Sequence, residues 1–169
     1  MQRARQIQKG MTLIELLVVV AIVGVLSAMA IVNYLIALDK SKQKKTMADI
    51  RSIASAWEAR ATDRGSYSAA GSTPVVFDWP SQEVTQAELE AILSPTYIRP
   101  MARVDGWGFP LEYALDLPIG SSSGAAIYAI RSPGRDGVFE STYSTATTER
   151  FECDIVYSNG QFIVAPGVK

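Results

Sequence analysis

An almost unbroken apolar run from Gly10 to Leu38 constrains this chain more than any other feature of its sequence. The run reads GMTLIELLVVVAIVGVLSAMAIVNYLIAL and contains one acidic residue, Glu15. About 20 apolar residues cross the ~30 Å hydrocarbon core of a bilayer, so the run is long enough to span a membrane. An ionisable group inside such a segment is costly and usually marks function. We therefore expect a membrane anchor in which Glu15 has a role of its own.

Residues 1–10 form a short leader with three basic residues and no acidic one, namely Arg3, Arg5 and Lys9. A basic segment before an apolar run suggests a secretory signal peptide, but this run is longer than the apolar region of such peptides. No small-x-small cleavage site clearly closes it, although Ala28 and Ala30 come close. The pattern favours a signal-anchor helix with its basic end in the cytoplasm. Charge counting alone leaves the orientation open, since four lysines follow the run at Lys40, Lys42, Lys44 and Lys45.

The helical pattern continues beyond the apolar run, and no proline interrupts residues 12–64. Apolar residues recur at spacings of three and four along the charged second half, at Met47, Ile50, Ala54, Trp57 and Ala61. This spacing places them on one face of a helix. We therefore predict a single helix from Thr12 to Arg64 that is apolar over 11–38 and amphipathic over 39–64. Gly65 is a natural C-terminal stop for it.

Residues 65–169 are expected to form a head domain. Ser, Gly and Pro are frequent in 66–80, which indicates a loop. Thr85 and Glu88 have the spacing of a capping box and predict a short helix over 85–93. Four segments favour strands, namely 111–116, 125–131, 153–158 and 161–166. Loops or extended connections are expected between them. Asn159-Gly160 predicts a hairpin turn between the last two strands. The predicted fold class is α+β, with one long helix packed on a small antiparallel sheet and a short second helix.

Composition excludes several classes of function. The chain of 169 residues has no His, the commonest general base and a frequent metal ligand, and shows no nucleophile motif or phosphate-binding loop. Cys153 is the one cysteine, so an intrachain disulfide is impossible. A formal net charge of -1 gives no global reason to expect nucleic-acid binding. We therefore expect a protein that is not an enzyme.

The segment GMTLIELLVVVAIVGVLSA resembles the N-terminal signature of type IV pilins and type II secretion pseudopilins. That signature has a basic leader ending in Gly, then an apolar residue, Thr, Leu, an apolar residue and Glu, followed by about 20 apolar residues. The resemblance implies a membrane peptidase that cuts between Gly10 and Met11, methylation of the new N-terminus, and a helical filament built from the N-terminal helices. Glu15, the fifth residue of the cut chain, would then pair with the N-terminus of a neighbouring subunit. Many of these helices carry Pro where this chain has Val32, so the local helix break associated with that Pro is in doubt here.

A second segment, DGWGFPLEY, resembles the D-x-W-G-x-P-x-x-Y motif of the major pseudopilin. Its matching residues are Asp105, Trp107, Gly108, Pro110 and Tyr113. We expect a structural role, in which a buried Trp107 packs the sheet onto the apolar face of the long helix. The match, together with the lone cysteine, favours a pseudopilin over a disulfide-closed pilin without excluding a pilus subunit.

The stretch YAIRSPGRDGVFE is also similar to the major pseudopilin, where the loop after Asp-Gly binds calcium. Five carboxylates here could supply the hard oxygen ligands that calcium prefers: Asp136, Glu140, Glu149, Glu152 and Asp154. Their spacing matches no EF-hand loop, and a solvated acidic loop explains them at least as well. Asp136 and Asp154 are the candidates we keep for a calcium site.

The resemblance implies a homopolymer that also contains minor pilins or pseudopilins and depends on the prepilin peptidase and an inner-membrane assembly platform. It places the subunit in the bacterial inner membrane before assembly, with a cytoplasmic N-terminus, and in a periplasmic or extracellular filament afterwards. One alternative is a type IV pilus subunit for adhesion, motility or DNA uptake. Another is a monomeric, signal-anchored binding protein.

Overall fold

The computed structural model describes residues 10–64, 76–77, 79, 82–117, 125, 127–141, 143–144, 146–148 and 150–166. It contains two compact units, Met1–Leu38 and Asp39–Lys169, and the division follows the last residue of the apolar run. Each unit is treated by itself below.

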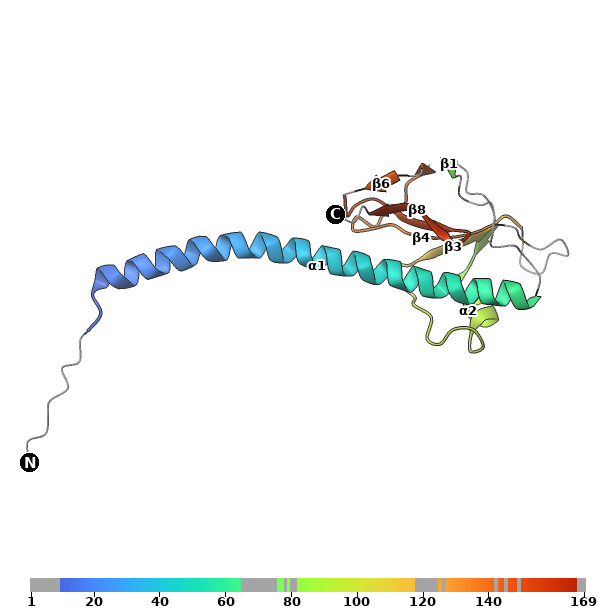
Figure 1. Ribbon diagram of the computed structural model, residues 1–169, viewed down its shortest axis with the longest axis horizontal. Coiled ribbons are helices and arrows are strands. Elements are labelled where there is room, and N and C mark those ends of the chain that lie inside the picture. Colours follow the sequence, from blue (N-terminus) through green and yellow to red (C-terminus); the bar gives the residue numbers. More distant parts are fainter. Residues whose placement is uncertain are drawn as a thin grey trace, which may run out of the picture. The chain divides into compact units, whose positions relative to one another are not determined.

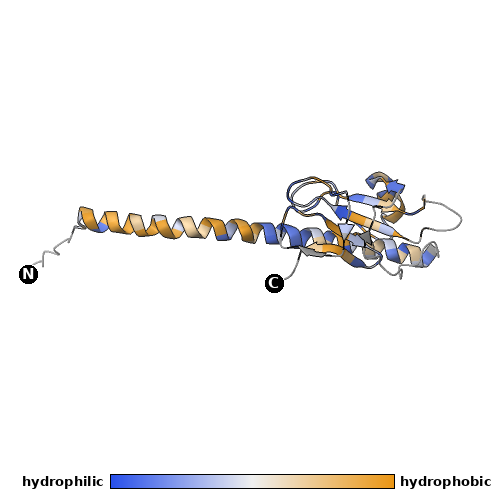
Figure 2. Cartoon of the chain, turned by 90° about the horizontal axis from the view of Figure 1, so that it is seen from above, coloured by the Kyte–Doolittle hydropathy of each residue, from blue (hydrophilic) through white to orange (hydrophobic). Residues whose placement is uncertain are grey.

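Helix α1 extends from Leu13 to Arg64 as one element of 52 residues (Figure 1). The predicted helix, Thr12 to Arg64, is therefore confirmed, and Val32 lies within continuous helix. The predicted stop, Gly65, falls outside the described residues. Figure 2 shows the change in character along this helix, from apolar residues in its first part to polar residues mixed with apolar ones in its second.

In the first unit, the apolar side chains of α1 are exposed within the described part of the chain. Leu13 is 85% exposed and Tyr34 is 63% exposed. By length and composition this is a helix that could cross a membrane. An apolar surface of this size in water would be unfavourable, so it needs lipid or protein around it.

In the second unit, the predicted apolar face of α1 is buried against the head domain. Ile50 and Ala54 are fully buried, Trp57 is 2% exposed, and Met47 packs partly against the same core. The Trp57 ring lies 5.2 Å from Tyr128 and makes an edge contact with Tyr113 at 6.5 Å. Aromatic contacts of this kind fix how the helix packs on the sheet.

Helix α2, Gln86–Leu93, begins at the predicted capping box. The Thr85 side chain accepts a hydrogen bond from the Glu88 backbone N–H, and the Glu88 carboxylate accepts one from the Thr85 N–H at 2.9 Å. The Glu88 carboxylate also accepts from the Thr85 hydroxyl at 2.7 Å, and the bonds from this hydroxyl and then from the Thr85 N–H lower the pKa of Glu88. Leu89 and Leu93 are fully buried in the main core.

The main sheet has the strand order β2-β3-β4-β7-β8-β6. Its strands are β2 (Gln82–Val84), β3 (Glu112–Leu115), β4 (Tyr128–Ser132), β6 (Ala146–Thr148), β7 (Ile155–Ser158) and β8 (Gln161–Pro166). Neighbours pair antiparallel except β6 and β8, which are parallel. The β7–β8 turn is the predicted one, with positive φ at both Asn159 (45°) and Gly160 (90°).

The α+β arrangement is confirmed, but several boundaries and strands differ from prediction. Strand β1, Val76–Phe77, lies in a segment predicted to be loop. Strands β5, Tyr143–Ser144, and β6 lie in the predicted loop 132–150. These strands are two or three residues long, too short for an alternating pattern to identify them. Strand β5 pairs with β1 in a separate two-stranded sheet.

Candidate functional site

The predicted processing site lies at an open end of the described chain. Gly10 and Met11 are both exposed, Met11 at 70%. A Cβ added at Gly10 would have no heavy atom within 4 Å. The peptide bond between these residues is thus accessible to an external protease.

Glu15 belongs to a capping box at the start of α1, which sequence reasoning missed. Its Oε2 accepts hydrogen bonds from the Thr12 backbone N–H at 2.8 Å and from the Thr12 hydroxyl at 2.9 Å. In return the Glu15 N–H donates to the Thr12 hydroxyl oxygen at 3.3 Å. The signal was available, because Thr-x-x-Glu is the same pattern that identified Thr85 and Glu88. The cap holds the Glu15 carboxylate over the first turn of α1, where the helix dipole favours a negative charge.

The DGWGFPLEY segment is organised around the carboxylate of Asp105, which is 2% exposed. Its Oδ1 accepts three backbone N–H bonds, at 2.8 Å from Trp107, 2.8 Å from Gly108 and 2.9 Å from Phe109. Its Oδ2 accepts the hydroxyl of Ser132, on β4, at 2.7 Å. One side chain therefore shapes the loop and ties it to the sheet.

The same loop lies directly on α1 through Gly106. The Gly106 N–H donates to the Thr46 hydroxyl oxygen at 2.8 Å, and that hydroxyl donates to the Lys42 carbonyl at 3.0 Å. A Cβ at residue 106 would lie 2.2 Å from the Lys42 carbonyl oxygen, so only glycine fits. This requirement explains the small residue between Asp105 and Trp107.

Trp107 packs against the core formed by helix and sheet, as predicted, but it is half-buried and not fully buried. The indole packs at the edge of the main core, and its N–H donates to Asp39 Oδ1, on α1, at 3.3 Å. The fully packed aromatic residue between helix and sheet is Trp57 of the helix itself. Asp39 also accepts from Arg135 at 3.1 Å, and Arg135 contacts Glu152. Arg135 thus contacts α1 through the Asp39 carboxylate, and Glu152 is linked to α1 through Arg135.

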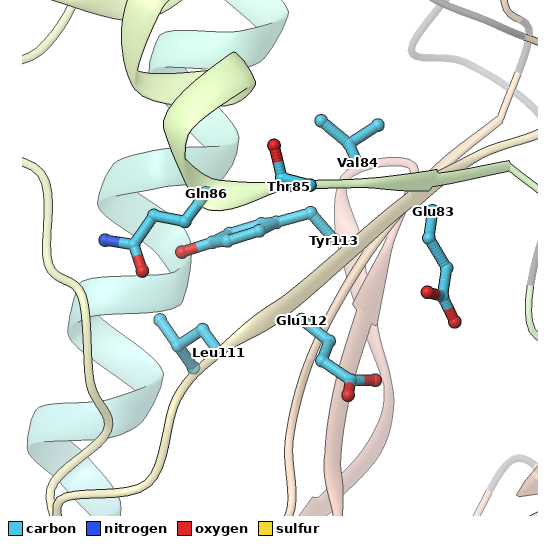
Figure 3. Close-up of a pocket in the computed structure, with 7 residues that line it drawn as sticks. All are labelled: Glu83, Val84, Thr85, Gln86, Leu111, Glu112 and Tyr113. Carbon is cyan, nitrogen blue, oxygen red and sulfur yellow. The ribbon is translucent and has the colours of Figure 1, made fainter.

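The other residues of the DGWGFPLEY motif lie in this loop or directly after it. Gly108 has φ +99°, a conformation that favours glycine. Pro110 forms an isolated antiparallel bridge with Val104 and leads into β3. Tyr113, on β3, is 1% exposed and lies beside a small open hollow with Gln86 and Leu111 (Figure 3). Burial, and then the nearby Glu90 carboxylate, raises the pKa of the Tyr113 hydroxyl.

The two calcium candidates differ in burial and in their hydrogen-bond partners. Asp136 is exposed, and its Oδ1 accepts from the Val138 N–H at 3.1 Å. Asp154 is fully buried, and its Oδ2 accepts from the Glu140 N–H at 2.9 Å and from the Tyr143 hydroxyl at 2.5 Å. Its Oδ1 has no hydrogen-bond partner among the described residues.

Calcium takes six to eight oxygen ligands, whereas the described part of the chain gathers no group of three or more His, Cys, Asp or Glu side chains. These residues alone therefore do not fit a calcium site. Glu149, another of the carboxylates considered, lies outside the described residues. Calcium binding stays a prediction.

Replacing Asp105 with Asn should destabilise the second unit by about 1–3 kcal/mol, since the charged acceptor of four hydrogen bonds becomes neutral and loses one oxygen. The measurement is urea unfolding of the full chain in detergent, followed by tryptophan fluorescence. Asp136→Asn makes the same chemical change at an exposed carboxylate and should alter stability by less than about 0.5 kcal/mol. Equal effects of the two variants would contradict the central role of Asp105.

The buried Asp154 should make unfolding depend on pH. Burial raises its pKa above the ordinary 3.8, against the opposing hydrogen bonds from Tyr143 and Glu140. The folded state then binds more protons than the unfolded state, so the Asp154 contribution to the free energy of unfolding falls as pH rises through this raised pKa. Asp154→Asn removes this titration. The stability difference between wild type and Asp154→Asn should therefore shift towards the variant from about pH 4 to pH 7. Parallel pH profiles in urea unfolding would show the assignment to be wrong.

Comparison with known proteins supports the resemblance seen in the sequence. The model of the "Prokaryotic N-terminal methylation motif" matches residues 5–31. The chain is 29% identical to the type II secretion system core protein G of Pseudomonas aeruginosa over 79% of this chain and 89% of that protein. It is 28% identical to the core protein G of Klebsiella michiganensis over 79% of this chain and 80% of that protein.

A further match is to a type IV pilin and covers part of each chain. The chain is 37% identical to the type IV major pilin protein PilA of Myxococcus xanthus over 36% of this chain and 27% of that protein. No solved structure gives a significant match to the chain. The chain therefore carries a prokaryotic N-terminal methylation motif, and over most of its length it is similar to type II secretion system core protein G.

Proposed function

We propose that this protein is a structural, non-catalytic subunit of a pilus or pseudopilus filament, assembled through α1. The observation that carries the proposal is the uncovered apolar half of α1, which begins beside an open Gly10–Met11 bond and carries Glu15 near its start. A membrane can cover this surface before assembly, and equivalent helices of other subunits can cover it in a filament. One surface thus serves both the anchored and the assembled state.

Glu15 is suited to select the register between neighbouring helices. Both hydrogen bonds from Thr12 go to its Oε2, which leaves Oε1 for a donor on another subunit. After cleavage, the new amine at Met11 of a neighbouring subunit is a suitable donor. It is positively charged and lies at the same end of its helix as Glu15. In an apolar filament core an unpaired charge is strongly unfavourable, so stacking that pairs amine and carboxylate is preferred.

The proposed filament is a type II secretion-like pseudopilus. The similarity to core protein G extends over most of the chain, and the Asp105 loop that resembles the major pseudopilin is built into the head. A type IV pilus subunit is the second candidate, favoured by the similarity to PilA over 60 residues. We place the subunit in the inner membrane with a cytoplasmic N-terminus before assembly. Its proposed partners are itself, minor subunits, a prepilin peptidase and the assembly platform.

Cleavage is expected after Gly10. Intact-mass analysis of the protein from membranes should give the mass of residues 11–169 plus one methyl group. Gly10→Leu should block cleavage, because a bulky side chain would fill the open space next to the scissile bond. Gly24→Leu, a control in the middle of the apolar segment, should still be cut. A wild-type protein that keeps all ten leader residues would refute the filament proposal and leave the anchored binding protein.

The charge of Glu15 is expected to matter for assembly and not for processing. Glu15→Gln can keep the capping box while losing the charge, whereas Glu15→Ala loses both. Both variants should be cleaved normally, and both should give at least about tenfold fewer filaments by electron microscopy of sheared cells. The exposed Glu83→Gln is the matched control. Wild-type filament yield from Glu15→Gln would show that capping, and not charge pairing, is what the residue contributes.

A further inference from the structure

Four lysines follow the apolar run, and three of them, Lys40, Lys42 and Lys44, have no part in the proposed processing or stacking. Residues 40–45 contain four lysines and no acidic residue, although the whole chain carries a net charge of -1. Lys45 reaches Asp49 at 3.9 Å, one turn on. Within the described residues no ion pair involves Lys40, Lys42 or Lys44. Among the described residues, the charges of Lys40, Lys42 and Lys44 are therefore not neutralised by ion pairs.

The packing of the second unit keeps these three lysines turned outward. Gln43 and Thr46 on the same segment are buried beneath the head, while Lys40, Lys42 and Lys44 are exposed. The nearby acid that could neutralise them, Asp39, is engaged by the Trp107 indole and by Arg135. Lys40 and Lys44 are four residues apart and lie on one face of the helix. Lys42, two residues from each of them, points to another side of the helix, and all three side chains are exposed.

Distance along α1 places these groups at one surface of the membrane. Glu15 and Tyr34 are 19 residues apart, or about 29 Å at ~1.5 Å per residue, which matches the ~30 Å hydrocarbon core. Tyr34 is an aromatic residue of the kind enriched at membrane–water boundaries. Lys40 follows six residues later in the sequence, and flexible lysine stems can bring their ammonium groups back to the headgroup layer.

We propose that Lys40, Lys42 and Lys44 bind the phosphate groups of anionic phospholipids in the leaflet opposite the leader. This inference rests on the proposed membrane-held state of the subunit. Each lysine near an anionic lipid surface contributes a factor of roughly five in affinity. The lysines set the depth of the helix before assembly, together with Glu15 at the other surface. Extraction into a filament breaks these contacts, so the anionic lipid content of the membrane opposes release of the subunit.

The test uses the full-length protein in nanodiscs of equal parts phosphatidylcholine and phosphatidylglycerol. Native mass spectrometry counts the phosphatidylglycerol molecules that remain on the protein after release. The triple variant Lys40→Gln, Lys42→Gln, Lys44→Gln should lower the apparent affinity for phosphatidylglycerol at least about tenfold. The triple change to Arg should keep it. Raising the salt concentration from 0.05 to 0.5 M should weaken retention by the wild type.

A matched control removes three positive charges from exposed head residues, as Arg99→Gln, Arg103→Gln, Arg150→Gln. It should retain phosphatidylglycerol like the wild type. Equal retention by the lysine-to-Gln variant would overturn the proposal. So would unchanged lipid retention with loss of cross-linking between subunits, which would assign the lysines to an acidic surface of a neighbouring subunit. Because the measurement is made on membrane-inserted monomers, failure of filament assembly would not affect it.

Discussion

The fold of the second unit depends on the hydrogen bonds that the carboxylate of Asp105 accepts. Four hydrogen bonds converge on it, three from the backbone of its own loop and one from Ser132 of β4. Burying a charge without partners would be prohibitive, but a carboxylate that accepts several N–H bonds is stabilised where it lies. The loop so formed presents Gly106 to α1 at a distance that excludes any side chain. The loop geometry and the helix contact therefore require each other.

Two capping boxes show how one local device serves two environments. Thr85 and Glu88 start α2 beside the buried core, and Thr12 and Glu15 start α1 where apolar residues follow without interruption. In both, the acid satisfies backbone donors that helix geometry leaves without partners. In α1 the box has a further consequence. The acid that starts the helix is also the one acidic residue of the apolar run, so its position relative to the helix axis is fixed before any neighbour arrives.

The large elements were predictable because their signals repeat over many residues. The run from Gly10 to Leu38 and the stripe through Ile50, Ala54 and Trp57 sufficed for α1, and Asn159-Gly160 sufficed for the last hairpin. Strands β1, β2, β5 and β6 were missed because two or three residues carry no period, and their pairing is decided by distant segments. Trp107 was predicted to be buried from residue type alone. Its burial depends on how close the loop lies to α1, and the contact between Gly106 and Lys42 determines that distance.

Helix α1 changes from apolar to amphipathic in the segment from Asp39 to Thr46. Some side chains of this segment bind the head, and others are the lysines proposed to bind lipid phosphate. Asp39 and Thr46 face the head and bind Trp107, Arg135 and Gly106. The lysines between them face outward. A polar residue that must bind the head and a cation that must reach phosphate cannot occupy the same face of a helix. The spacing of these residues satisfies both requirements within two turns, without a break in the helix. A single continuous helix can therefore fix the head on one side and, in the proposed membrane-held state, meet lipid headgroups on the other.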